Sequence, residues 1–152
     1  MARPKSHGAL EPNADPLASL LEGIVVPEEL LRRLVDSCDA DGLERSAKHV
    51  AESDFSAILE TYKREAIPFD FEEIMAEVLS GYFRMFRIEG SSIKGGRRIM
   101  RLSHKRGPKW SRYLRGYLQA AYGMASKESV DIEISDQFVQ VSFSVDRAAR
   151  RR

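Results

Sequence analysis

The stretch RLSHKRGPKWSRYLRGYL, from Arg101 to Leu118, concentrates the side chains of this sequence that can do chemistry. It holds six Lys or Arg residues and no acid, and it includes Trp110, the only tryptophan of the sequence. Guanidinium and ammonium groups bind phosphates and carboxylates through charge-assisted hydrogen bonds. The chemistry that this stretch predicts is therefore the binding of an anion.

The net charge of +1 over 152 residues hides a strong asymmetry. The sequence from Leu10 to Glu89 has 18 acids and 8 bases, whereas the sequence from Lys94 to Lys127 has ten bases and no acid. Such a division says more about partners than the overall isoelectric point does. It predicts an acidic half followed by a basic half.

The basic side chains fall into three groups that we expect to form one exposed positive surface. In the predicted strand, successive side chains alternate between the two sides of the sheet, so Arg97, Arg101 and Lys105, four residues apart, point to the same side. In the helix predicted after Pro108, the basic residues share a face opposite the apolar stripe. The loop between them ends at a helix N-terminus, where backbone N–H groups favour an anion. The predicted phosphate-binding residues are Arg97, Arg101, Lys105, Arg106, Lys109, Arg112 and Arg115.

Nucleic-acid phosphate is the commonest partner of such a surface. Our leading hypothesis is a nonenzymatic module of transcription, chromatin or the ribosome that holds DNA or RNA by its phosphates. Two alternatives stay open. The surface can be neutralised internally, through pairing of the strand arginines with Asp131 and Glu133 across the sheet or by the acidic half within one chain or across a homodimer. Alternatively, the surface can bind a small anion or an acidic protein. The function would then be protein interaction, dimerisation or small-ligand sensing in a regulator, with the helical half as a contact surface.

No catalytic or metal-binding constellation is recognisable. His7, His49 and His104 lie far apart, and no pair has metal-ligand spacing. His104 is expected to be a hydrogen-bonded residue at the sheet edge, and Cys38, the single cysteine, to be a buried inert thiol. The segment IKGGRR lacks the length and the hydroxyl residue of a phosphate-binding P-loop. The sequence therefore predicts neither an enzyme nor a cofactor.

The sequence contains no apolar run of about 18 residues and no apolar signal segment near its start. With a single cysteine it can form no intrachain disulfide, which fits a reducing compartment. These features predict a soluble cytoplasmic protein that has no contact with a membrane.

Hydrophobic periodicity predicts an α+β fold. Residues 1–14 are expected to form a flexible basic arm, 15–146 a single domain, and 147–152 a basic tail. In the acidic part, 15–84, apolar residues at helical spacing predict helices that begin near Pro16, Pro27, Asp41, Asp54 and Asp70. In 85–146 the period changes to two, back to helical after Pro108, and to two again. This predicts β-hairpin, helix, β-hairpin, forming a mainly antiparallel four-stranded sheet covered by the Trp110 helix.

One motif of the basic stretch consists of His104, Gly107, Lys109, Trp110, Ser111, Tyr113 and Leu114. It resembles a poorly characterised archaeal domain that often follows a ribbon-helix-helix segment in transcriptional regulators. The resemblance implies an intracellular regulatory or binding module, and it carries no catalytic residues over. The sequence differs in showing no ribbon-helix-helix segment and in having two bases, Lys105 and Arg106, inside the motif.

Overall fold

The computed structural model describes residues 26–67 and 70–145. The predicted arm, the helix predicted from Pro16 and the basic tail lie outside these residues. The elements, in chain order, are α1 (Glu28–Ser37), α2 (Ala40–Arg64), α3 (Phe71–Ile74), the π-helix η2 (Met75–Tyr82), β1 (Arg87–Lys94), β2 (Arg97–Ser103), α4 (Pro108–Ala125), β3 (Asp131–Ile134) and β4 (Phe138–Ser144). The α+β prediction is therefore confirmed.

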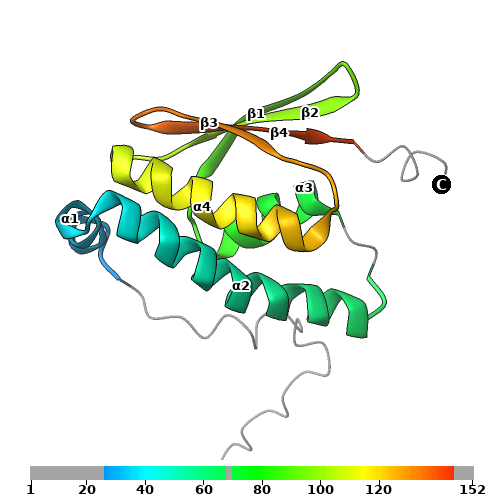
Figure 1. The fold of residues 1–152 in the computed structure, drawn as a ribbon, viewed down its shortest axis with the longest axis horizontal. Coiled ribbons are helices and arrows are strands. Elements are labelled where there is room, and N and C mark those ends of the chain that lie inside the picture. The colour runs from blue at the N-terminus through cyan, green and yellow to red at the C-terminus, as the bar shows by residue number, and fades with distance from the viewer. Residues whose placement is uncertain (1–25, 68–69, 146–152) are drawn as a thin grey trace, which may run out of the picture.

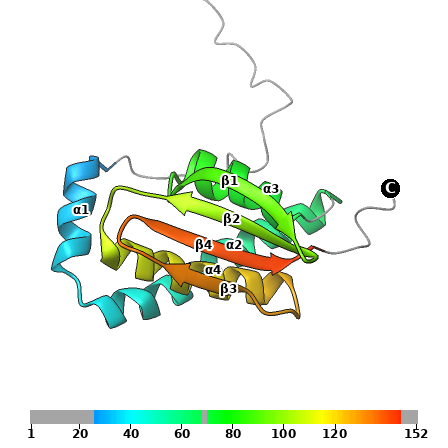
Figure 2. The same ribbon diagram turned by 90° about the horizontal axis from the view of Figure 1, so that it is seen from above.

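The four strands form one antiparallel sheet in the order β1-β2-β4-β3. α4 lies beneath one face of the sheet together with α3, and α2 packs on the far side of α4 (Figure 1). Seen from above, the opposite face of the sheet is not covered by any helix of the described part of the chain (Figure 2). None of the helices in 26–67 and 70–145 has the length and apolarity to cross a membrane.

The first hairpin is longer than its composition predicts. The glycine and serine residues of EGSSIKGG, from Glu89 to Gly96, favour a turn, but Glu89 to Lys94 are part of β1. The turn consists of Gly95 and Gly96 alone, with φ of 58° and 76°. Two consecutive positive φ values are typical of a type I′ turn, whose twist matches that of paired strands. A bulge between Ile88 and Gly90 takes up one extra residue of β1.

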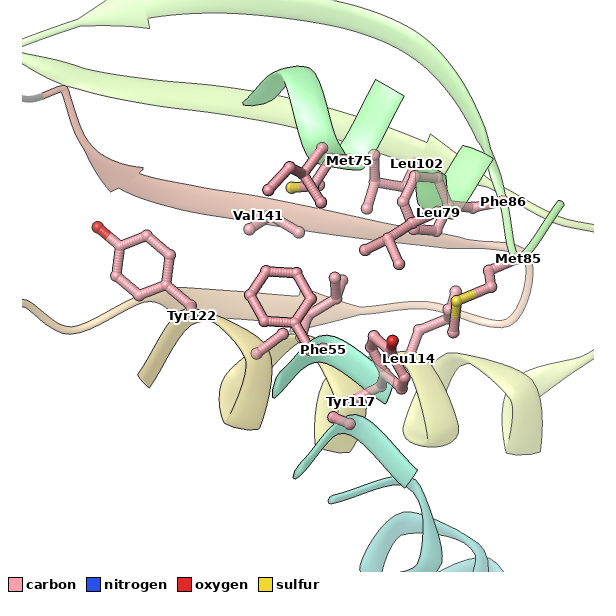
Figure 3. Close-up of a cluster of buried hydrophobic side chains, with 14 of the residues drawn as sticks. Phe55, Met75, Leu79, Met85, Phe86, Leu102, Leu114, Tyr117, Tyr122 and Val141 are labelled. Carbon is pink, nitrogen blue, oxygen red and sulfur yellow. The ribbon is translucent and has the colours of Figure 1, made fainter. Parts of the chain in front are cut away.

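The apolar stripe of α4 faces the core as predicted, and its members Trp110, Leu114, Tyr117, Leu118 and Ala121 are all buried. Phe55 of α2, Tyr122 of α4 and Val141 of β4 belong to the same cluster (Figure 3). Phe71 of α3 contacts Phe55, Tyr122 and Phe143 edge to face, with ring centroids 5.0–5.9 Å apart. The core thus joins both halves of the chain.

The helices predicted from Asp41 and Asp54 are one continuous helix, α2. Its N-cap is Asp39, whose carboxylate accepts a hydrogen bond from the Gly42 N–H at 2.7 Å. Neither proline nor glycine interrupts the sequence between the two predicted helices, and the buried face repeats every three or four residues through Ala47, Ala51, Phe55 and Ile58. The continuous buried face therefore explains why no separate helix begins at Asp54.

The helix predicted from Asp70 begins there, because the Asp70 carboxylate accepts hydrogen bonds from the N–H groups of Glu72 and Glu73. From Met75 on, however, it is a π-helix. Longer-range hydrogen bonds close it, including one from the Met85 N–H to the Leu79 carbonyl at 3.0 Å. Segments of π-helix are rare and often mark functional sites.

Gly116 sets the distance between α2 and α4. A Cβ atom at Gly116 would lie 2.5 Å from the backbone oxygen of Glu44, whereas one at Gly123 of the same helix would meet no atom within 4 Å.

We predict that Gly116→Ala lowers the free energy of unfolding by about 1–3 kcal/mol, because α2 must move away. The control Gly123→Ala should raise it by about 0.5–1 kcal/mol, because alanine favours a helix. Urea denaturation measures both, and equal effects would contradict the close approach.

Candidate anion-binding site

We expected the basic face of α4 to lie in solvent, but it packs against α2. Arg112 donates to Glu44 Oε2 from Nε at 3.1 Å and from Nη2 at 3.0 Å, and it also pairs with Asp41. Arg115 donates to both carboxylate oxygens of Glu44 at 2.9 and 2.8 Å. Gly116 next to Arg115 permits this approach. The acidic half therefore neutralises these two predicted phosphate ligands within the chain.

The hydrogen bond from Arg115, followed by that from Arg112, holds the pKa of Glu44 below the ordinary value for glutamate. Burial acts in the opposite direction, since only 14 % of the Glu44 side chain is exposed. The two arginines thus outweigh the cost of taking the carboxylate out of water.

Lys109 holds the end of α1. Its ammonium group donates to the carbonyl oxygens of Asp36 at 2.6 Å and Cys38 at 2.7 Å. The last carbonyls of a helix have no partner within the helix, and a basic side chain satisfies them. Lys109 therefore serves the contact between α4 and α1. The Cys38 residue at this junction is exposed, so its prediction as a buried thiol is wrong.

Arg106, predicted to face solvent, is nearly buried, with 11 % of its side chain exposed. Its guanidinium carbon lies over the Trp110 ring, 4.7 Å from the centroid. Nε and Nη2 donate to the two oxygens of Glu28 at 2.6 and 3.0 Å. The residue after Arg106 is Gly107, which has a φ of 82°, a backbone conformation that favours glycine. Trp110 is buried as predicted, and its indole N–H donates to the Met85 carbonyl at 2.8 Å.

The strand arginines have partners on the uncovered face of the sheet. Arg97 donates to Asp131 at 2.9 Å and to the backbone oxygen of Ser142 at 2.7 Å, so pairing with Asp131 across the sheet is confirmed. Arg101 lies 3.4 Å from Glu89 and stacks over the Phe138 ring, 4.1 Å from its centroid. It therefore takes its acid from the neighbouring strand and not from Glu133.

His104 is a buried structural residue. Its Nδ1 accepts a hydrogen bond from the Arg106 backbone N–H at 3.3 Å, so Nε2 carries the proton and donates to Ser111 Oγ at 2.8 Å. The Ser111 hydroxyl donates to the Ser135 carbonyl. Burial, aided by the charge of Arg106, lowers the pKa of His104 to about 4. The neutral ring ties the loop after β2 to α4 and to the β3–β4 turn, which agrees with the expected hydrogen-bonded role.

Lys105, the remaining predicted residue, faces a cleft of about 430 Å³ between the end of η2, the start of β1 and the loop after β2. Arg84 and Arg87 line the same cleft. Among the described residues, none of these three exposed side chains has a hydrogen-bond or ion-pair partner. The remaining lining residues are Glu28, Ser80, Gly81, Met85, Phe86, Ser103, His104 and Arg106. We call this site the basic cleft.

Arg84 and Arg87 did not stand out as candidate ligands in the sequence, because both fall within the part that has a large excess of acids. The antiparallel register places Arg87 opposite Ser103, two residues before Lys105. Only the pairing of β1 with β2 brings the three side chains together. The sequence offers one local signal for this site. Arg84 and Arg87 lie on either side of Met85, where the spacing of apolar residues changes from helical to alternating.

Within 26–67 and 70–145, no group of three or more His, Cys, Asp and Glu side chains could hold a metal ion. The chemistry of the basic cleft is electrostatic. Its basic side chains can hold an anion and orient it against a lining that is mainly apolar.

The lowered pKa of Glu44 predicts an acid-sensitive contact between α2 and α4. A carboxylate with a depressed folded-state pKa stabilises the fold above its ordinary value of 4.5, and the stabilisation disappears as the pH falls through the folded-state pKa. Wild type should therefore exceed Glu44→Gln in free energy of unfolding at pH 7, and the difference should shrink towards pH 3. Glu60→Gln, an exposed acid of the same helix, controls for the lost charge. A difference that is constant from pH 7 to pH 3 would contradict this role.

No protein-family model, curated protein or solved structure matches this chain. The resemblance of its Trp110 motif to an archaeal regulatory domain therefore stays a prediction.

Proposed function

We propose that the protein is a nonenzymatic module that binds a small anionic molecule in the basic cleft. This proposal takes up the small-ligand alternative of the sequence analysis. The observation that carries it is the placement of Arg84, Arg87 and Lys105 around one cleft, without a partner among the described residues. A cleft lined by charges of one sign concentrates the electrostatic field and attracts counter-ions.

The contrast with the other basic residues supports this proposal. Six of the seven predicted phosphate ligands have a hydrogen bond, an ion pair or both within the chain, and only Lys105 has neither. A guanidinium already engaged by a carboxylate must give up that partner before it can bind a phosphate, which reduces the gain. The nucleic-acid hypothesis relied on a continuous uncompensated surface, so this pattern favours the small-ligand alternative.

The backbone at Arg84 gives a second line of support. Arg84 has a φ of 50°, in the left-handed region that non-glycine residues rarely adopt. It directly follows the unusual turns of η2 and the Phe83 cap. Strained backbone of this kind costs of the order of 1–3 kcal/mol and is found preferentially at binding sites. A glycine would adopt this conformation without strain, so the presence of an arginine favours a role for its side chain.

The size and lining of the cleft define the ligand class. A volume of about 430 Å³ lies within the usual range for small-molecule sites. Cations lie on the η2, β1 and loop sides, and the exposed lining of the cleft is mainly apolar. The ligand that fits these features has one phosphate or carboxylate group and a compact apolar body.

Calorimetric titration of the full chain with phenyl phosphate and benzoate tests this function. We expect millimolar or tighter binding, and at least a tenfold loss in the variant Arg84→Gln/Arg87→Gln/Lys105→Gln. A matched control removes three exposed bases of α2, as Arg45→Gln/Lys48→Gln/Lys63→Gln, and should retain the affinity. Absence of binding by wild type, or an equal loss in the control, would overturn the proposal.

A second measurement separates this function from nucleic-acid binding. The three cleft cations can neutralise at most three phosphates, so removing them should flatten the slope of log affinity against log salt for duplex DNA by no more than about 2.7 units. We also expect duplex DNA to displace phenyl phosphate poorly. Submicromolar DNA binding that the cleft variant keeps would restore the nucleic-acid hypothesis, with contacts outside the cleft.

A further inference from the structure

We infer that Glu28 is an internal substitute for the ligand, and that an anion in the basic cleft displaces it from Arg106 and releases the N-terminal end of α1. This inference rests on the proposed function, because it assigns a consequence to occupancy of the same cleft.

The first step is competition for one guanidinium group. Glu28 and Arg106 both line the basic cleft. The carboxylate of Glu28 accepts from Arg106 Nε at 2.6 Å and from Nη2 at 3.0 Å. This two-pronged geometry is the one by which arginine binds the carboxylate or phosphate group of a ligand. An anion that enters the cleft can therefore take the position of the Glu28 carboxylate on Arg106.

The second step is that Glu28 moves while Arg106 stays. Arg106 is held by the Trp110 ring and by a hydrogen bond from Nη1 to the Met85 carbonyl at 3.4 Å. Glu28 lies in the first turn of α1, and 60 % of its side chain is exposed. Returning an exposed carboxylate to water costs little. Leaving a nearly buried guanidinium without an anion costs much more, so the exchange is favourable only when a ligand replaces Glu28.

The third step is that α1 has few other attachments. Val35 is its one buried residue, and Leu31 is half-buried. Leu30 and Leu34 remain 49 % and 52 % exposed. α1 lies at the edge of the molecule, beside the loop that leads into α4 (Figure 2). Lys109 holds its C-terminal end, so loss of the Glu28 contact frees the N-terminal end in particular. Segments with so little buried surface open locally at low cost.

Linkage makes the coupling reciprocal, because a ligand that displaces Glu28 binds more tightly once Glu28 is gone. We expect Glu28→Ala to raise the affinity for phenyl phosphate at least about fivefold. Glu29→Ala is the matched control. Glu29 is the next residue of α1, pairs with Arg32 and Arg33 on its own helix, and does not line the cleft. It should leave the affinity unchanged.

A spin label on α1 measures its release directly. The label is attached at Leu30→Cys in a Cys38→Ser background, and a second sample carries it at Val50→Cys on α2 as a control. Phenyl phosphate should increase label mobility at position 30 and not at position 50. Glu28→Ala should increase mobility at position 30 without any ligand. This result would test whether the Glu28–Arg106 contact holds α1, even if the probe fails to bind.

The outcomes distinguish the two proposals. Calorimetry on the same labelled protein reports binding independently of motion. Failure of all probes to bind overturns the proposed function. Binding that leaves the label at position 30 unchanged, together with unchanged affinity in Glu28→Ala, overturns the exchange of Glu28 for ligand while the proposed function stands.

Discussion

The contact between α2 and α4 is the interaction on which the rest of the structure depends. Gly116 allows the two helices to approach until Glu44 lies between Arg112 and Arg115. This contact joins the acidic half of the chain to the basic half, and it fixes α4 beneath the sheet. With α4 in place, its first turn carries Lys109 and Trp110 to the positions where they hold α1 and support Arg106. The geometry of the basic cleft is therefore a consequence of helix packing some distance away.

Charge serves two different purposes in this fold, and burial separates them. Arginines that face α2 are matched by acids that lie in the interface, where a missing partner would leave an uncompensated charge in a poorly solvated place. Cations at the end of the sheet meet water and have no such constraint. Arginine thus holds two helices together in one place and remains available to a ligand in another. A sequence-wide count of charges cannot separate these two groups, because it records the sign of a side chain and not its surroundings.

The sequence was sufficient to predict the elements that depend on local periodicity. The alternation in β2, β3 and β4, the apolar stripe that includes Trp110 and Leu114, and the capping by Asp70 are all confirmed. Features that depend on tertiary contacts were not predictable. The partners of Arg106 and Arg112 come from residues about seventy positions away. The π-helix has no compositional signature here, and Arg84 reaches the cleft only because that helix ends beside β1.

Glu44 and Glu28 show how one kind of ion pair can be permanent or exchangeable. Both carboxylates accept hydrogen bonds from an arginine, and in both the pKa is held below its ordinary value chiefly by those bonds. Their exposure differs, at 14 % for Glu44 and 60 % for Glu28. Separating Glu44 from its arginines would open the helix interface, whereas Glu28 is already largely in contact with water. Of these two carboxylates, an external anion can therefore displace only Glu28, and its partner Arg106 lines the basic cleft.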